Sequence, residues 1–189
     1  MTSTKGLEAM HTPIAVELVD GSFDAYLKST KHWIDHTSML QTAFREQAED
    51  VLLKIQDGNV RDLLGRIVES ARKHESLAAE LQSIVGADLA RWPKPAGTFT
   101  ARMRAALADV LGTEAGAAAP WRDLQQLFLG SLTAMSAFGA AEQLGYALGL
   151  HRLAELCFDV VAEKHRDHLV LQELTLEFAP WGVLYKAQI

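Results

Sequence analysis

The chain gathers acidic and imidazole side chains in one short stretch, residues 163–168. Glu163 and Asp167 are four residues apart, and His165 and His168 lie close to them. Residues four apart share one face of a helix, and the apolar residues on this face indicate that at least one carboxylate points inward. Carboxylates and imidazoles are ligands for iron, manganese and zinc. The stretch is therefore part of a possible metal site, although a solvated charged helix has the same spacing.

Other histidines also bear on metal binding. His74 lies among apolar residues of a helical pattern, where a single histidine is more often a hydrogen-bonded core residue than a ligand. His32 and His36 have the i, i+4 spacing at which two imidazoles can share a transition metal, but no carboxylate stands at the right offset. A surface or interface pair is the other interpretation of these two residues.

Patterns for other kinds of site are weak or missing. The sequence has no Gly-rich phosphate loop after a strand and no nucleophile elbow. The single cysteine, Cys157, lies on an apolar stripe, so we predict that it packs as a small hydrophobic residue rather than acting as a reactive thiol. Ser131 and Ala134 belong to a small-residue face, for which tight packing is favoured over a ligand pocket.

Four long helices must position these side chains. Apolar residues at helical spacing predict them over residues 22–55, 60–85, 120–148 and 151–178. Asn59 is the predicted cap of the second helix, and Gly149 is the predicted left-handed residue between the third and fourth. Pro180 is predicted to stop the fourth helix. Apolar residues of the second helix alternate steps of four and three, which is typical of a left-handed helix bundle.

The connections predict how the helices are arranged. Short turns join the first helix to the second and the third to the fourth, so each pair forms an antiparallel hairpin. Residues 87–119 form a long crossover, with a short extra helix predicted over 100–111. We therefore predict an all-α, ferritin-like four-helix bundle as a single domain over 1–189, with a loose N-terminal arm at 1–13. The apolar segment 181–189 is expected to pack across the bundle or against a partner chain.

Composition excludes several classes of partner. The formal net charge is −6, and phosphate neutralisation needs clustered Lys and Arg, so nucleic acid is not expected as the main partner. The sequence shows neither the apolar core of a signal peptide nor a run long enough to span a membrane. A soluble cytoplasmic protein is expected.

Several segments carry a family resemblance: Asp62-Leu63 through Ile84-Val85, Phe138-Gly139 with Leu148-Gly149, and Ala162-Glu163 with Asp167. On these residues the chain resembles the ferritin-like stress-response family of the YciE and YciF proteins, known as domain of unknown function 892. The resemblance covers about two thirds of the chain. It implies a four-helix bundle, often dimeric, which in several members is able to hold a two-metal carboxylate site.

Most acidic positions of that family carry other residues here, namely Arg72, Lys73, Ser131 and Ala134. Glu163 and Asp167 remain, and Glu46 is the nearest candidate on the first helix. Two carboxylates from one helix cannot enclose a two-metal site. Carboxylates left in the core would need a positive partner, which Arg72 or Lys73 can provide.

The sequence therefore predicts a ferritin-like bundle without an intact metal site and without a cofactor. We expect a non-catalytic structural, binding or stress-associated protein that forms a homodimer. The alternative is a carboxylate-bridged iron or manganese protein with redox or peroxide activity, whose ligands would be Glu46, His74, Glu163, Asp167 and His168. A second alternative is a bundle that binds a small molecule at the face of Ser131 and Ala134.

Overall fold

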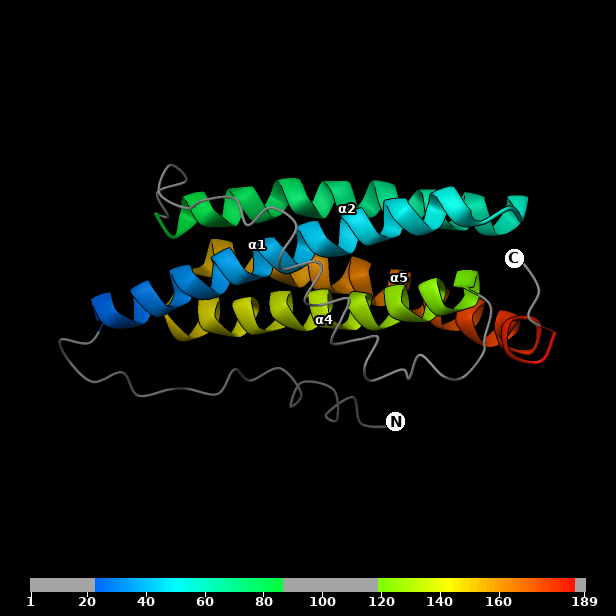
Figure 1. Ribbon diagram of the computed structural model, residues 1–189. Coiled ribbons are helices and arrows are strands. Elements are labelled where there is room, and N and C mark those ends of the chain that lie inside the picture. The colour runs from blue at the N-terminus through cyan, green and yellow to red at the C-terminus, as the bar shows by residue number, and fades with distance from the viewer. Residues whose placement is uncertain (1–22, 87–118, 186–189) are drawn as a thin grey trace, which may run out of the picture.

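The computed structural model describes residues 23–86 and 119–185, and every regular element within them is an α-helix. The helices are α1 (Phe23–Lys54), α2 (Gly58–Ile84), α4 (Ala119–Ala147) and α5 (His151–Val183), shown in Figure 1. The predicted all-α class is confirmed. The predicted arm at 1–13, the short helix at 100–111 and the crossover, apart from Ala119, lie outside the described residues.

Two predictions about helix ends are wrong. Asp57, not Asn59, caps α2, because its carboxylate accepts from the backbone N–H of Asn59 at 2.9 Å and of Val60 at 3.0 Å. Pro180 does not stop α5, which continues to Val183. A proline this close to the end of a helix removes few backbone hydrogen bonds. Beyond Pro180, the contact of Gly182 with Trp121 holds the chain against α4. Gly149 has φ of +69°, as predicted for the turn between α4 and α5.

The helices run antiparallel to their main neighbours. From α1, Trp33 donates to the carbonyl of Ala137 on α4 at 3.0 Å, while Lys54 at the other end of α1 pairs with Asp123 at 2.8 Å. The helix α5 lies chiefly beside α4 and α2, and α1 chiefly beside α2 and α4. As a result α2 and α4 point the same way, and the end of α2 and the start of α4 lie at opposite ends of the bundle, roughly 40 Å apart.

Two apolar clusters fill the core. One joins α1, α2, α4 and α5 around Phe44, Leu64 and Leu171, and the other joins them around Ile34, Leu81 and Phe138. Where the two clusters meet lies a group of polar residues, which we call the polar layer. Its members are Gln41, Ser70, His74, Ser131, Glu163, Lys164, Asp167 and His168. The polar layer is therefore positioned by apolar packing on both sides.

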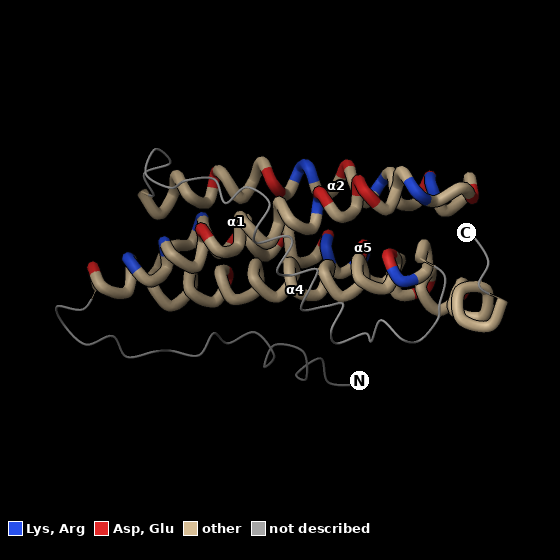
Figure 2. Tube along the Cα trace, in the orientation of Figure 1, with Lys and Arg blue, Asp and Glu red and all other residues tan. Residues whose placement is uncertain are grey.

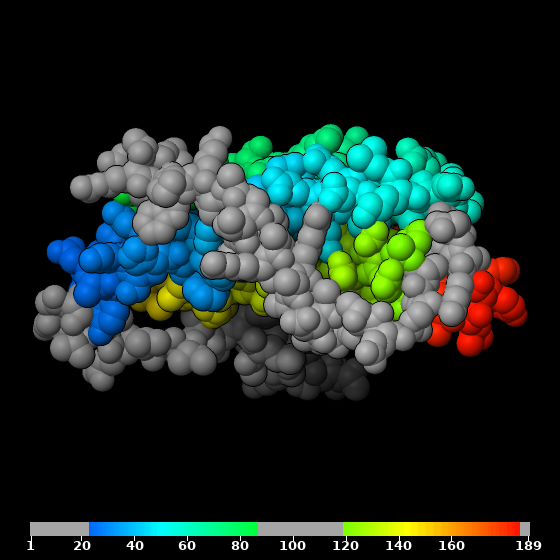
Figure 3. Space-filling view, in the orientation of Figure 1, coloured from blue at the N-terminus to red at the C-terminus, as the bar shows by residue number. Residues whose placement is uncertain are grey.

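The C-terminal end of α5 projects from one end of the elongated bundle (Figure 3). Trp181, Leu184 and Tyr185 are exposed, whereas Gly182 is buried against Trp121. The predicted packing of segment 181–189 across the bundle thus holds for Gly182 and not for its exposed neighbours, and residues 186–189 lie outside the described residues.

The contact between α4 and α5 depends on a small residue at Gly145. A Cβ atom there would lie 2.8 Å from the backbone nitrogen of Ala154 and 3.1 Å from its Cβ. Because backbone cannot move aside as a side chain can, we expect Gly145→Ala to lower the free energy of unfolding by about 1–3 kcal/mol. Urea denaturation measures the change.

Gly139→Ala in the same helix is the matched control. A Cβ at Gly139 has no neighbour within 4 Å, so this change should raise the free energy of unfolding by about 0.5–1 kcal/mol through helix propensity alone. If both variants gained stability, α4 and α5 would not approach as closely as the structure shows.

Candidate functional site

The structure disperses the five predicted metal ligands. Glu46 lies on the outside of α1 with its side chain 48% exposed, beside Arg45. His74 and Glu163 are in contact, but Asp167 and His168 bond to other groups. Within residues 23–86 and 119–185, no three His, Cys, Asp or Glu side chains form a group that could hold a metal ion. The sequence therefore located the region of the polar layer but not the contacts within it.

His74 and Glu163 form the centre of the polar layer. Nε2 of His74 lies 3.0 Å from Oε2 of Glu163, and Lys73 donates to Oε1 of the same carboxylate at 2.7 Å. The hydrogen bond from Lys73 is the main cause that lowers the pKa of Glu163, so this carboxylate is ionised at neutral pH. Lys73 thus pairs with Glu163 as predicted, although the Glu163 side chain is 30% exposed rather than buried in the core, and Arg72 pairs with Glu49 instead.

His74 is fully buried, and burial lowers its pKa to about 4, with the nearby charge of Lys164 adding to the effect. The imidazole is therefore neutral at pH 7. Because a carboxylate only accepts hydrogen bonds, Nε2 of His74 must carry the proton and donate a hydrogen bond to Glu163. Nδ1 is then a buried acceptor, and it has no hydrogen-bond partner among the described residues.

Lys164 is the residue that the sequence analysis missed. Its side chain is buried to 3% exposure, and its Nζ has no hydrogen-bond partner among the described residues. The Nζ atom lies 4.7 Å from the ring centre of Phe44 and 5.5 Å from that of Phe138, so it stands between the two apolar clusters. Burial lowers the pKa of Lys164 to about 7, partly offset by the charge of Asp167.

Spacing was the available signal for Lys164. It follows Val160 by four residues and Cys157 by seven, and it precedes Leu171 by seven, which places it on the apolar stripe of α5. All three of those neighbours are buried. A lysine in the middle of a buried stripe is rare, and this position was the signal in the sequence that could have identified Lys164.

Asp167 and His168 contact different neighbours of α5. Asp167 accepts a hydrogen bond from Ser70 of α2 at 2.7 Å, and burial is the main cause that raises its pKa. Nδ1 of His168 lies 2.7 Å from the hydroxyl oxygen of Ser131 on α4, and its ring stacks on Phe128 at 4.6 Å. Burial also lowers the pKa of His168. The two residues face different helices, so they cannot serve as ligands of one ion in this arrangement.

Gln41 completes the polar layer from α1. Its Nε2 donates to the carbonyl of Ala71 at 2.7 Å, which leaves Oε1 as a buried acceptor without a partner among the described residues. Ala71 lies one turn before His74 on α2, and Phe44 lies one turn after Gln41 on α1. Three unpartnered polar atoms, on Gln41, His74 and Lys164, therefore come from three helices at one level of the bundle.

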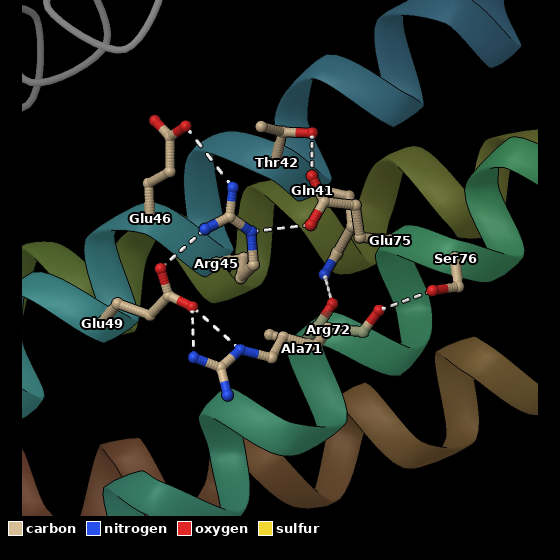
Figure 4. A network of polar contacts seen from close by, with 9 residues as sticks. All are labelled: Gln41, Thr42, Arg45, Glu46, Glu49, Ala71, Arg72, Glu75 and Ser76. Atoms are coloured by element: carbon tan, nitrogen blue, oxygen red, sulfur yellow. Dashed lines mark hydrogen bonds and ion pairs between the residues drawn. The ribbon is translucent and has the colours of Figure 1, made fainter.

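A second polar group lies on the outside of α1 and α2 (Figure 4). Arg45 contacts Glu49 and Glu75, each at 2.6 Å, and Arg72 bonds to the other oxygen of Glu49 at 2.9 Å. Thr42 donates to Glu75 at 2.7 Å. Charges are paired across the two helices, so this group fastens the first hairpin. The pairs of Arg45 with Glu49 and Glu75 are partly buried, whereas that of Arg72 with Glu49 is more exposed and contributes little to stability.

Cys157 is fully buried, and burial raises the pKa of its thiol to about 12. A thiol with so high a pKa has almost no nucleophilic thiolate at neutral pH. The prediction that Cys157 packs as a small hydrophobic residue is confirmed.

Comparison with known proteins adds no relative: no family model, no curated protein and no solved structure matches the chain. The resemblance to the YciE and YciF family therefore rests on the residues quoted above. The described helices include none that is both long enough and apolar enough to cross a membrane.

Proposed function

We propose that this protein is a ferritin-like bundle of the YciE and YciF type whose core holds a lysine-centred polar layer in place of a metal centre. We propose that it acts as a non-catalytic binding or structural protein associated with stress, as a homodimer in the cytoplasm. The burial of Lys164 beside Glu163 and Asp167 is the observation that carries this proposal.

The contacts within the polar layer support this proposal, because most of the oxygen atoms that could bind a cation already accept hydrogen bonds. Both oxygens of Glu163 are engaged, one by Lys73 and one by His74. One oxygen of Asp167 accepts a hydrogen bond from Ser70, and burial raises the pKa of this carboxyl group, which weakens it as a metal ligand. When Lys164 is protonated, its charge also repels a divalent ion.

Metal analysis tests the proposal directly. Protein purified without added metal, and again after anaerobic incubation with Fe(II) or Mn(II) and desalting, should contain far less than one ion per chain. Mass spectrometry of the elements gives the ratio. The Glu163→Ala variant is the control. If the predicted ligands hold a metal, the ratio of metal to protein should be lower in this variant than in the wild type.

Stoichiometric iron or manganese that is lost in Glu163→Ala would overturn the proposal. That result, together with peroxide consumption by the loaded protein, would establish the alternative of a carboxylate-bridged metalloprotein that uses Glu163 as a ligand.

Binding of a small molecule is a second candidate, favoured by the three unpartnered atoms of the polar layer. Oε1 of Gln41 and Nδ1 of His74 are acceptors, whereas Nζ of Lys164 has hydrogens to donate. A complementary ligand would donate two hydrogen bonds and accept one, as water and primary amides do. Such an amide ligand would add mass in native mass spectrometry of the wild type and be absent from Lys164→Met.

A further inference from the structure

The outer face of α5 carries exposed apolar residues in a regular row. Phe158 is 50% exposed, Leu169 is 47% and Leu176 is 61%, and Val183 follows at 39%. On the neighbouring helix α4, Leu132 is 45% exposed. Scattered exposed apolar residues are ordinary, but apolar residues that recur on one helix face mark an interaction surface, here with His165 and Gln172 between them.

The spacing of the row is that of a coiled-coil seam. Steps of four and three residues alternate along one stripe, which we call the α5 stripe: Phe158, Ala162, His165, Leu169, Gln172, Leu176, Ala179 and Val183. A seam with this repeat keeps one face toward a partner helix over many turns. The face of α5 that packs inside the bundle is a different one, which contains Cys157, Lys164 and Leu171.

Charge is excluded from the α5 stripe, which contains no Lys, Arg, Asp or Glu. At about 100° per residue, the exposed charged residues Glu155, Asp159, Arg166, Glu173 and Glu177 fall to one side of it. That is the side from which Arg152 reaches Glu80 of α2. Figure 2 shows that α4 is also almost free of charged residues, whereas α2 carries them along its length.

We propose that the α5 stripe and the adjoining face of α4 form the interface with a second copy of this chain. The inference deepens the proposed function, on whose homodimer it rests, by naming the surface. A two-fold axis between His165 and Leu169 places Phe158 of each copy opposite Leu176 of the other, since both lie nine residues from position 167. Closed two-fold dimers of this kind use one patch on both subunits.

A second copy fits this surface better than an unlike partner does. Two copies of the α5 stripe have the same spacing of four and three residues, so they can pack against each other without any other segment of the chain. Copies with a formal net charge of −6 repel one another, and an uncharged face is where that repulsion is least.

The area of this surface is also close to that of a standard interface. From Phe158 to Val183 the stripe is roughly 38 Å long, and α4 with α5 is roughly 20 Å wide, which gives about 760 Å². A standard interface needs about 800 Å² per partner.

Sedimentation velocity on the full chain tests the interface. The wild type should be a dimer, and Leu169→Glu should raise the dimer dissociation constant by about 100-fold, because two carboxylates would meet near the axis. Leu169 is already half exposed, so circular dichroism should show an intact helical bundle. Leu53→Glu makes the same change at a residue of α1 that is 78% exposed, and it should leave the dimer unchanged.

Charge reversal gives a second measurement. An equimolar mixture of Leu169→Glu and Leu169→Lys should regain the dimer, because opposite charges then lie close together on either side of the two-fold axis. If the wild type is a dimer and Leu169→Glu remains one, this surface is not the interface, although the homodimer of the proposed function stands. A wild type that stays monomeric at high concentration would overturn both.

Discussion

Replacing Lys164 with methionine should raise the free energy of unfolding at pH 7 by roughly 2–4 kcal/mol. The amine is buried, has no hydrogen-bond partner among the described residues, and lies between the rings of Phe44 and Phe138. Its pKa falls from 10.5 to about 7 on folding, so the folded state disfavours the charged form that the unfolded chain carries at neutral pH. Methionine fills a similar volume without a polar end. Urea denaturation of both proteins measures the difference.

The pH dependence of that difference identifies its cause. Because the folded pKa lies below the unfolded value, the unfolded chain binds more protons between about pH 7 and 10.5, and wild-type stability rises with pH there. The advantage of Lys164→Met should therefore be largest at and below pH 7 and shrink toward pH 10.5. Lys54→Met is the control, since Lys54 is an exposed lysine, and its effect should be small throughout. A Lys164→Met variant less stable than wild type at pH 7 would mean that the amine has a partner in solution.

Lowering the pH from 6.5 to 4 should remove up to roughly 3 kcal/mol of stability through His74. Burial, aided by the charge of Lys164, lowers the pKa of His74 from 6.5 to about 4. In this window the unfolded chain binds a proton that the folded protein excludes, so stability falls as the solution becomes acidic. Glu163 should lose its contribution to stability at lower pH than His74 does. Its pKa is lowered in the folded protein, so the carboxylate stays ionised until the solution is more acidic.

A His74→Gln variant should have a flatter stability profile between pH 6.5 and 4, whatever its stability at pH 7. The slope is the quantity to compare, because glutamine also leaves polar atoms in the core. His151→Gln, which changes an exposed histidine at the start of α5, should keep the wild-type slope. Equal slopes in wild type and His74→Gln would show that His74 is not held neutral by the fold.

The sequence was sufficient to find the helices because helix formation is governed by local patterns. The apolar repeat of α2 and the glycine at 149 act over a few residues, and both features are present in the structure. It was less successful at helix ends, where Asp57 and Asn59 are equally good caps by type. Only the backbone conformation selected Asp57.

The candidate site was predicted in part. Glu163, Asp167 and His74 do lie in the polar layer, as their positions near apolar stripes indicated. Glu46 lies on the outside of α1, because a small rotation of a helix about its axis decides whether such a position faces the core. His168 lies against Ser131 rather than beside Glu163, because residues five positions apart on α5 point about 140° apart around the helix axis.

Sequence alone thus determined that residues 23–86 and 119–185 form helices and where the turns between paired helices fall, since both depend on neighbours within a few residues. Only the tertiary structure decided which polar groups meet. His74 and Glu163 are 89 residues apart in the chain, and Ser70 and Asp167 are 97 apart. Their contacts depend on how four helices rotate to bury two apolar clusters, and that same packing encloses Lys164 between Phe44 and Phe138. No local pattern specifies a packing that involves all four helices at once.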